Sequence, residues 1–361
     1  MLICFVFWAS LPLLNVRSLP LVKQAHLNRM DRKLFVSPIS FIHGLEDIVD
    51  RYDSFIIDQW GVLHNGETPY SHVLECLINL RNSGKKMIML SNSSKRKQSA
   101  IDGMKKVGID PLLFDEVITS GELGWSMINK RDFSSAHIYR RDLRALSDED
   151  DVMKVFVLGN GSDDLEYVHS CRCILAPAQD ADFILCRGTF SILDGKTDKT
   201  YKSAKDFMVG CEQSLQECAS AGLPMLVTNP DFYRPGCGSP MPGLVGQMYS
   251  KLVGDESKVT LIGKPLQMVY ESSLKALTAV VGTETVLRRD RVCCIGDSME
   301  HDIKGAYGAQ MASVFICNGV HASELNRAEG ECARPDQDSI SFFMLKHREY
   351  MPDFLLPCFK W

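Results

Sequence analysis

The chain has 361 residues, enough for two domains or one large one, and its 45% hydrophobic and 24% charged content is ordinary for a globular protein. The formal net charge of -5 argues against nucleic acid or an anionic membrane surface as the main partner. None of the 13 cysteines forms a CxxC pair, so we interpret them as small buried hydrophobic residues in a reducing compartment.

The N-terminal segment resembles a targeting sequence. Residues 2–14 form an apolar run that is too short to cross a bilayer comfortably, and residues 1–30 contain basic residues but no acidic one. This pattern is typical of a cleaved signal or an organellar transit peptide. A third option is that the mature chain starts at Met30. We therefore expect the protein in the cytoplasm, or in an organelle if residues 1–29 are a transit peptide, with no stable membrane span.

From about residue 48 onward, short apolar runs alternate with helical patterns. Runs of about four Val, Ile, Leu and Met residues suit strands that are buried on both faces of a parallel sheet. One helix begins after Pro265, where Leu266, Val269, Leu274 and Leu277 fall on or near one stripe. The apolar runs are Phe55–Ile57, Met87–Leu90, Val155–Leu158, Phe183–Cys186, Met225–Val227, Val259–Ile262, Val292–Ile295 and Val314–Cys317.

This alternation predicts a doubly wound α/β architecture. Residues 155–227 carry their own succession of strands and helices, and the flanking segments carry another. One α/β domain inserted into another is the simplest interpretation. Residues 352–359 predict a last short strand.

Polar residues follow several of the predicted strands. Asp58, Ser91, Lys264 and Asp297 each lie just after an apolar run, and Asp302 is close behind. Open α/β sheets present their ligand-binding residues at these strand ends, so one sheet edge would gather them. Each of these residues alone is commonly a helix cap or part of a turn. The whole set in this order favours a catalytic site.

The residue types indicate which chemistry. Carboxylates without softer ligands suit Mg²⁺, and a serine hydroxyl, amides at a helix start and a lysine suit a phosphoryl group. One carboxylate can then attack phosphorus and form an aspartyl-phosphate. A dehydrogenase would need GxGxxG after Ile57 and a nucleotide kinase GxxxxGK[ST]; both motifs are absent from the sequence.

Five segments together resemble one known family. They are "GVLHNG", "LSNSSKR", "VTNPDFYRPG", "LIGKP" and "IGDSMEHDIKGA", within roughly residues 48–320. They resemble class IIA of the haloacid dehalogenase (HAD) superfamily of phosphohydrolases, which includes NagD-type, p-nitrophenyl and pyridoxal-phosphate phosphatases. The resemblance implies a Rossmann-like core with a large inserted α/β cap. The implied organisation is an N-terminal extension (1–47), the core's first part (48–122), the cap (123–257), and the core's second part with a C-terminal extension (258–361).

The resemblance also implies a magnesium site. Asp58 would be the nucleophile and a Mg²⁺ ligand, and the backbone carbonyl of Trp60 would be a second ligand. Asp297 would be the third ligand, with Asp302 as a further ligand or a neighbouring acid. Lys264 would neutralise Asp58 and the transferring phosphoryl group.

The implied substrate is a small phosphorylated metabolite. Ser91 and the amide of Asn92 would hold phosphate oxygens, while Asn229 and Asp231 would read the substrate from the cap. The alternative for these two cap residues is a tight turn after a strand. Large-capped relatives are often dimers, so a homodimer is an analogy that the sequence leaves open.

The residues after the first strand predict a flap. Asn65-Gly66 lies between Val62–His64 and Glu67–Thr68, which is a strong signal for a two-residue β-hairpin. Such a hairpin would lie over the metal and under the cap.

Trp60 departs from the family pattern. The family's phosphatases have there a second Asp that protonates the leaving oxygen and then activates water, help that is typically worth roughly 10²–10⁴-fold. One hypothesis is slow hydrolysis, or a leaving group that needs little protonation. A second is that His64 substitutes, although an exposed hairpin residue is the more common explanation for a histidine in such a position. A third is a catalytically impaired binding or regulatory module for Mg²⁺ and a phosphorylated ligand.

Overall fold

The protein is seen in a computed structural model, which describes residues 40–134, 152–234, 236–282 and 287–361. Residues 1–29 lie outside these ranges, so the transit peptide and the alternative start at Met30 stay predictions. Within the described ranges, no helix combines the length and the apolar character that a bilayer crossing requires.

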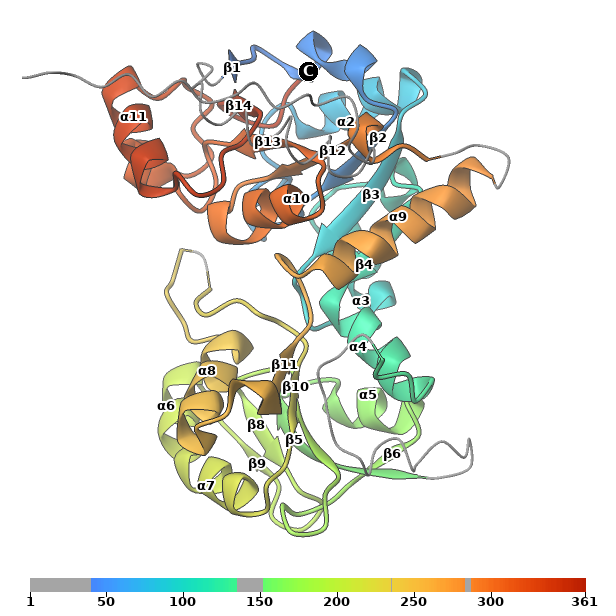
Figure 1. Ribbon diagram of the computed structural model, residues 1–361, viewed down its shortest axis with the longest axis vertical. Helices are drawn as coiled ribbons and strands as arrows, with labels where there is room; N and C mark the ends of the chain where they lie inside the picture. The colour runs from blue at the N-terminus through green and yellow to red at the C-terminus, as the bar shows by residue number, and fades with distance from the viewer. Residues whose placement is uncertain (1–39, 135–151, 235, 283–286) are drawn as a thin grey trace, which may run out of the picture. The chain divides into compact units, whose positions relative to one another are not determined.

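The core is a seven-stranded sheet with the strand order β1-β14-β13-β12-β2-β3-β4 (Figure 1). β2 is central and pairs in parallel with β12 and β3, so Ile57 aligns with Ile295 on one side and Met89 on the other. The strands are β1 Ser40–Phe41, β2 Ser54–Ile57, β3 Lys86–Ser91, β4 Glu116–Thr119, β12 Val292–Gly296, β13 Ala312–Ile316 and β14 Phe354–Leu356.

Helices cover both faces of this sheet because alternate residues of β2 point to opposite sides. Phe55 and Ile57 pack in the same apolar cluster as α2, whereas Ile56 packs in the cluster that contains residues of α9 and α10. α9 runs along β3 and β4 (Figure 1). The helices of this part of the chain are α2 Val73–Asn82, α3 Lys97–Lys106, α4 Ser120–Asn129, α9 Gln267–Val281, α10 Lys304–Gly308 and α11 Gln337–Lys346.

The second sheet has the order β11-β10-β7-β5-β8-β9, with β6 also paired to β5. Its central pairs are parallel, but β8 is antiparallel to β5 and to β9, so this sheet is mixed. Its strands are β5 Met153–Gly159, β6 Cys173–Leu175, β7 Phe183–Cys186, β8 Ser191–Leu193, β9 Lys199–Thr200, β10 Met225–Val227 and β11 Val259–Leu261.

The second sheet is also packed on both faces. Val155 and Val157 face a cluster with Tyr167, while Phe156 and Leu158 face the cluster of the helices after β9. Its helices are α5 Asp164–Ser170, α6 Ala204–Gly210, α7 Glu212–Ser220 and α8 Pro242–Val253. Short 3₁₀ turns are η2 Leu45–Asp47, η3 Val49–Arg51, η4 Pro111–Leu113, η5 Glu256–Lys258, η6 Arg289–Arg291 and η8 Ala322–Leu325.

The predicted doubly wound α/β architecture is confirmed, and each predicted strand overlaps a strand of the structure. The last predicted strand, within 352–359, is β14, which is parallel to β13. The sequence analysis missed β1, β4, β6, β8 and β9, which are short or only partly apolar. The domain boundaries themselves stay predictions.

One inference about sheet membership is wrong. The strand before Lys264 was expected to end at the same sheet edge as the strands before Asp58 and Asp297. β11 instead pairs in parallel with β10 of the second sheet, with Val227 opposite Leu261. Lys264 reaches the core through the turn at Gly263, and not because its strand belongs to the core sheet.

The two ends of the described core meet. Ile42 donates its N–H to the Leu355 carbonyl at 3.0 Å, and Leu45 donates to the Lys360 carbonyl at 2.9 Å. Leu45 is completely buried. The chain therefore enters the core before residue 48, where the sequence analysis began it.

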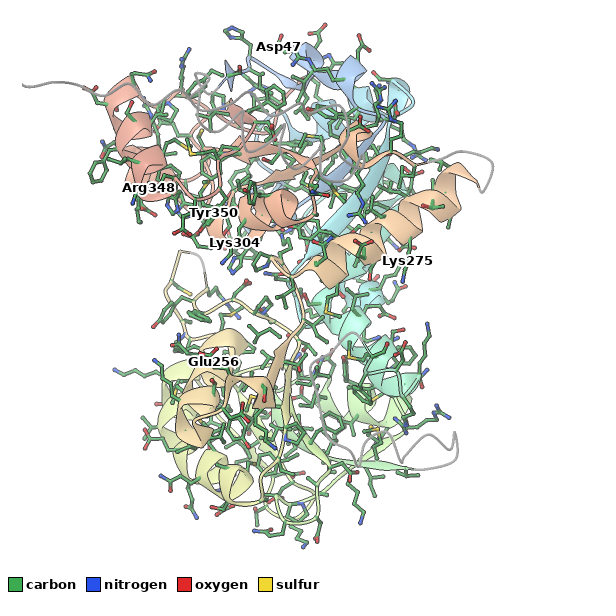
Figure 2. The ribbon with its side chains drawn as sticks, viewed as in Figure 1. Asp47, Glu256, Lys275, Lys304, Arg348 and Tyr350 are labelled. Carbon is green, nitrogen blue, oxygen red and sulfur yellow. A yellow bond between two sulfur atoms is a disulfide. The ribbon has the colours of Figure 1, made fainter. Side chains whose placement is uncertain are left out.

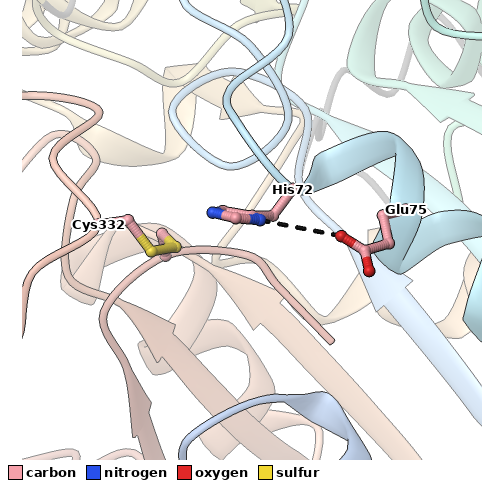
Figure 3. Close-up of a disulfide and its surroundings, with 4 residues drawn as sticks. His72, Glu75 and Cys332 are labelled. Atoms are coloured by element: carbon pink, nitrogen blue, oxygen red, sulfur yellow. Dashed lines mark ion pairs between the residues drawn. A yellow bond between two sulfur atoms is a disulfide. The ribbon is translucent and has the colours of Figure 1, made fainter.

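The interpretation of every cysteine as a reduced, buried residue is partly wrong. Cys332 and Cys358 form a disulfide with Cα atoms 5.0 Å apart, and Figure 3 shows it with the His72–Glu75 ion pair in its surroundings. Among the described free cysteines only Cys237 is exposed. The rest are buried, as predicted.

Shortening one buried side chain of the last strand should destabilise the core. Leu356→Ala removes a fully buried side chain of β14, so we expect the free energy of unfolding to fall by about 2–5 kcal/mol. Urea unfolding followed by tryptophan fluorescence measures this loss. Leu345→Ala on α11 is the control, because that side chain is 65% exposed, and it should change the value by less than about 0.5 kcal/mol. Equal effects of both variants would contradict this fold.

Candidate active site

Three carboxylates converge at the end of the core sheet. Asp58 follows β2 directly and donates its N–H to the Ile295 carbonyl at 2.9 Å, while Asp297 follows β12. Asp302 lies in a π-helical turn, η7 Met299–Ile303. One oxygen from each of the three carboxylates lies within 4.8 Å of the others. The sequence prediction that these acids meet is therefore correct in geometry, while their roles stay predictions.

Lys264 joins two of these acids. Its ammonium donates to Oδ1 of Asp58 and, at 2.8 Å, to Oδ1 of Asp302, and the side chain is almost completely buried. The Asn92 side chain holds the main chain here, because its Oδ1 accepts the Lys264 N–H at 2.7 Å and its Nδ2 donates to the Lys264 carbonyl at 3.3 Å. The lysine is thus fixed by its backbone as well as by its charge.

Burial and crowding shift the pKa values of this cluster. Burial raises the pKa of Asp58 well above its usual range, and the charges of Asp302 and Asp297 add to this shift while Lys264 opposes it. Burial also raises the pKa of Asp297 to about 7, again with help from Asp302. Burial alone would lower the pKa of Lys264, but the attraction of Asp302 and Asp58 outweighs it and the pKa is raised. Lys264 therefore stays charged at neutral pH.

The cluster fits a hard divalent cation. Three ionised carboxylates and one ammonium leave two negative charges uncompensated in a buried place. Oxygen ligands of this kind suit Mg²⁺, which binds through few carboxylates and keeps several waters. The raised pKa values of Asp58 and Asp297 come from burial first and from this excess of negative charge second.

The main chain approaches Asp297 from two sides. A Cβ atom on Gly61, where φ is +80°, would lie 1.9 Å from Oδ2 of Asp297, and a Cβ on Gly319 would lie 2.1 Å from the same oxygen. Val320 donates its N–H to that oxygen at 2.6 Å. The peptide between Trp60 and Gly61 therefore passes beside the acids, where the predicted carbonyl ligand would have to be.

The predicted phosphate-binding residues lie at the end of β3. Ser91 and Asn92 are both 7% exposed, and Oγ of Ser91 accepts the Ser93 N–H at 3.3 Å. Asn92 also donates through Nδ2 to Oδ1 of Asp231 at 2.8 Å. The structure therefore brings the Ser91–Asn92 segment and Asp231 together.

The two explanations of the Asn229–Asp231 segment turn out to be compatible. Oδ1 of Asn229 accepts the Asp231 N–H at 2.9 Å, which makes a tight turn after β10. The Asp231 carboxylate is at the same time 2.8 Å from the Asn92 amide. Contact of either residue with a substrate stays a prediction.

The predicted β-hairpin flap is found only in part, because the chain turns back on itself with an antiparallel bridge between His64 and Pro69 but forms no regular strand pair among the described residues. The segment has only isolated bridges, His64 with Trp60 and with Pro69, and none of the described strands lies within it. Oδ1 of Asn65 accepts the N–H groups of Glu67 and Thr68, each at 3.0 Å. This side-chain turn replaces the expected two-residue turn, because asparagine can satisfy the backbone two and three residues ahead.

His64 and Trp60 pack against each other in this loop. Their rings meet edge to face with centroids 5.7 Å apart, and a Cβ on Gly66 would lie 2.3 Å from the indole. His64 is buried, so the alternative of an exposed hairpin residue is wrong. Its Nδ1 accepts the Gly66 N–H at 2.9 Å, which leaves its proton on Nε2.

The sequence analysis missed several neighbours of the site. Nδ1 of His301 lies 3.2 Å from Oγ of Ser298 and 3.6 Å from Oδ1 of Asp231, so His301 stands beside the predicted cap residue. Val320 could have been found by examining the residues just after the predicted strand Val314–Cys317. His301 carries no signal in the sequence, because only the fold brings it near Asp231.

Comparison with known proteins agrees with this architecture. A model of haloacid dehalogenase-like hydrolases matches residues 55–171, and a second HAD-hydrolase-like model matches residues 261–337. A 4-nitrophenylphosphatase from Schizosaccharomyces pombe is 25% identical over 77% of this chain and 88% of its own length. The chain belongs to the haloacid dehalogenase-like hydrolases.

Two solved structures have a similar fold. A haloacid dehalogenase-like hydrolase from Brucella suis 1330 has a TM-score of 0.66 at 23% identity, covering 88% of this chain and 100% of that one. NagD from E. coli K-12 has a TM-score of 0.54 at 18% identity, covering 85% and 96%. The chain thus shares the fold of the NagD and 4-nitrophenylphosphatase class, as its motifs indicated.

Magnesium should stabilise the protein more at high pH than at low pH. Folding raises the pKa of Asp297 from 3.8 to about 7, so without metal the free energy of unfolding falls as the pH rises through this window. A cation that binds the ionised form offsets the loss, by about 2.7 kcal/mol at 100 times its Kd. We expect the Mg²⁺-induced rise in Tm to be larger near pH 8 than near pH 5.5. Asp297→Asn should reduce this pH-dependent difference, and Asp58, whose pKa is also raised, should account for what remains. An equal rise at both pH values in the unmodified protein would contradict the assignment.

Proposed function

We propose that the protein is a Mg²⁺-dependent phosphatase that hydrolyses the phosphomonoester of a small metabolite through an aspartyl-phosphate on Asp58. The observation that carries this proposal is the buried cluster of Asp58, Asp297 and Asp302 with Lys264 bonded to two of them. The similarity to a curated 4-nitrophenylphosphatase supports the same reaction class.

Each group of the cluster has a task in this proposal. Bound Mg²⁺ would supply positive charge to the phosphoryl oxygens, held by Asp58, Asp297, Asp302 and the Trp60 carbonyl. An oxygen of Asp58 attacks phosphorus while the bond to the leaving oxygen breaks. Lys264 and the Ser91 hydroxyl balance the charge of the phosphoryl group.

Proton transfer is the weak point of this site. The indole of Trp60 can neither donate a proton to the leaving oxygen nor accept one from water. Burial lowers the pKa of His64, so its imidazole is neutral at pH 7 and is a poor acid. The same neutral ring could take a proton from the attacking water only through Nδ1, which accepts the Gly66 N–H, so His64 assists this step poorly unless that hydrogen bond breaks. The substrate should therefore be one whose leaving group departs with little protonation.

The nucleophile can be tested directly. With Mg²⁺ and a panel of phosphate esters that includes p-nitrophenyl phosphate, the unmodified protein should release phosphate and Asp58→Asn should reduce release to background. The substitution keeps the size of the side chain and removes its nucleophilic charge. Absence of release above the Asp58→Asn background across a broad panel would overturn the enzymatic proposal.

The role of Trp60 predicts how the rate depends on the leaving group. For the unmodified protein, kcat/KM should fall steeply along a series of aryl and alkyl phosphates as the pKa of the leaving alcohol rises. Trp60→Asp should flatten this dependence and speed the poorest leaving groups by roughly 10²–10⁴-fold. Trp60→Asn is the matched control, because it makes a similar space without an acid. Equal slopes for all three proteins would show that the missing acid does not limit the reaction.

A second candidate function follows from the same residue. Because Trp60 removes the acid, the site could bind Mg²⁺ and a phosphorylated ligand as a regulatory module. This candidate predicts a Mg²⁺-dependent rise in Tm with phosphate esters and no turnover. Turnover by the unmodified protein separates the two, and His64→Ala then tests whether His64 assists, since it should slow turnover and leave ligand stabilisation unchanged if it does. The homodimer stays a prediction that light scattering can test.

A further inference from the structure

A second cluster of ligating side chains lies away from the three acids. His321 follows β13, Glu324 lies on η8, and His347 follows α11. One ligand atom from each of these residues lies within 4.8 Å of the others. Both imidazoles are largely buried. Nearby, the ammonium of Lys304 lies 5.9 Å from the ring centre of Tyr350, and both are labelled in Figure 2.

Glu300 accounts for one nitrogen of each imidazole. Nε2 of His321 lies 3.0 Å from Oε2 of Glu300, and Nδ1 of His347 lies 3.5 Å from Oε1 of the same carboxylate. The Met299 N–H is also 3.3 Å from Nε2 of His321. The contact with the Glu300 carboxylate is shorter and can be charge-assisted. We therefore place a proton on Nε2 of His321, which donates it in a hydrogen bond to Glu300. One carboxylate thus hydrogen-bonds to the ring of His321 and lies at ion-pair distance from the ring of His347.

The other nitrogens of the two rings differ in their partners. Nδ1 of His321 is 2.7 Å from Oε1 of Glu324. Nε2 of His347 is buried and has no hydrogen-bond partner within the described part of the chain, which is costly for a polar atom. His347 itself is only 5% exposed. His321 Nδ1 and Glu324 Oε1 thus satisfy each other, whereas Nε2 of His347 has no partner among the described residues.

A metal ion would give Nε2 of His347 a partner and would replace the hydrogen bond between His321 and Glu324. Zn²⁺ and similar transition metals prefer imidazole nitrogen and accept carboxylate oxygen, in sets of three protein ligands with a further open position. Ligating histidines normally donate their other N–H to a carboxylate, and Glu300 already stands in that position for both rings. The ammonium of Lys346 contacts Oε2 of Glu324 and leaves Oε1 for the metal.

We propose that His321 Nδ1, His347 Nε2 and Glu324 Oε1 form a transition-metal site, with Zn²⁺ as the metal of best chemical fit. The site is distinct from the Asp58 cluster and does not rest on the proposed phosphatase function. It would tie η8 and the end of α11 to η7, where Glu300 and Asp302 both lie. Val320, whose N–H holds Asp297, immediately precedes His321. Metal binding here would therefore stiffen the supports of two of the three acids.

The competing explanation is an ion-pair network without metal. Hydrogen bonds to Glu300 and Glu324 outweigh burial and raise the pKa of His321, so a proton on Nδ1 could bridge to Glu324. This network explains His321 but leaves Nε2 of His347 unsatisfied. The two explanations differ in whether the chain binds a transition metal.

Calorimetric titration of the chelator-treated, full-length protein with Zn²⁺, in excess Mg²⁺, tests the proposal. We expect one Zn²⁺ to bind per chain. His347→Gln and Glu324→Gln should each weaken binding by more than tenfold, because the loss of a ligand costs at least as much as the 10–100-fold typical of an orienting group. Co²⁺ in place of Zn²⁺ should give the visible absorption of a nitrogen- and oxygen-ligated ion, and the same two variants should lose it.

Asp58→Asn is the matched control, because it alters the other cluster and should leave Zn²⁺ binding unchanged. Failure of the unmodified protein to bind Zn²⁺ in excess Mg²⁺ would overturn the proposal. Binding that survives in both His347→Gln and Glu324→Gln but disappears in Asp58→Asn would also overturn it. Glu324 is partly exposed, so Glu324→Gln should keep the fold and decides the matter if His347→Gln does not fold.

Discussion

The buried ammonium of Lys264 is the interaction on which the candidate site depends. It bonds to Asp58 and Asp302, and it is the positive charge that the described structure places among three acids. Removing one partner of such a buried group leaves an uncompensated charge, which is strongly destabilising. The lysine therefore both permits the acids to lie together and limits how many can be ionised without a further cation.

The position of Lys264 depends on contacts between the two sheets. Lys264 follows a strand of the second sheet, and Asn92, at the end of a core strand, holds its peptide on both sides. Ser94 donates its hydroxyl to the Arg187 carbonyl, and the completely buried Arg187 side chain pairs with Asp163 and Asp164. The segment that would bind phosphate is thus attached to the second sheet. A ligand that contacts both sheets would therefore act on the same hydrogen bonds that position Lys264.

Much of the site was predictable because parallel strands end at one edge of a sheet. Asp58 and Asp297 follow adjacent strands, and their convergence follows from that rule. Lys264 was found by the same rule, although its strand belongs to the other sheet. The prediction that Lys264 lies at the site is therefore correct, but the rule behind it does not apply, because β11 is not a strand of the core sheet.

The remaining errors arise where side chains decide the local structure. Asn65-Gly66 signals a two-residue hairpin, but the Asn65 side chain forms its own turn with the backbone instead. The grouping of His321 with Glu300 and His347 depends on how the C-terminal segment packs, which no local pattern records. Pairing of Cys332 with Cys358 is non-local in the same way.

The central claim is that Asp58 becomes phosphorylated and that its dephosphorylation is poorly assisted beside Trp60. Acid quenching of the protein during turnover of p-nitrophenyl phosphate, followed by mass spectrometry of the peptide that contains Asp58, tests this most directly. The account predicts that this peptide carries a phosphoryl group that builds up to a substantial fraction of the protein and is absent from Asp58→Asn. Continuing phosphate release with an unmodified Asp58 peptide at every quench time would contradict it.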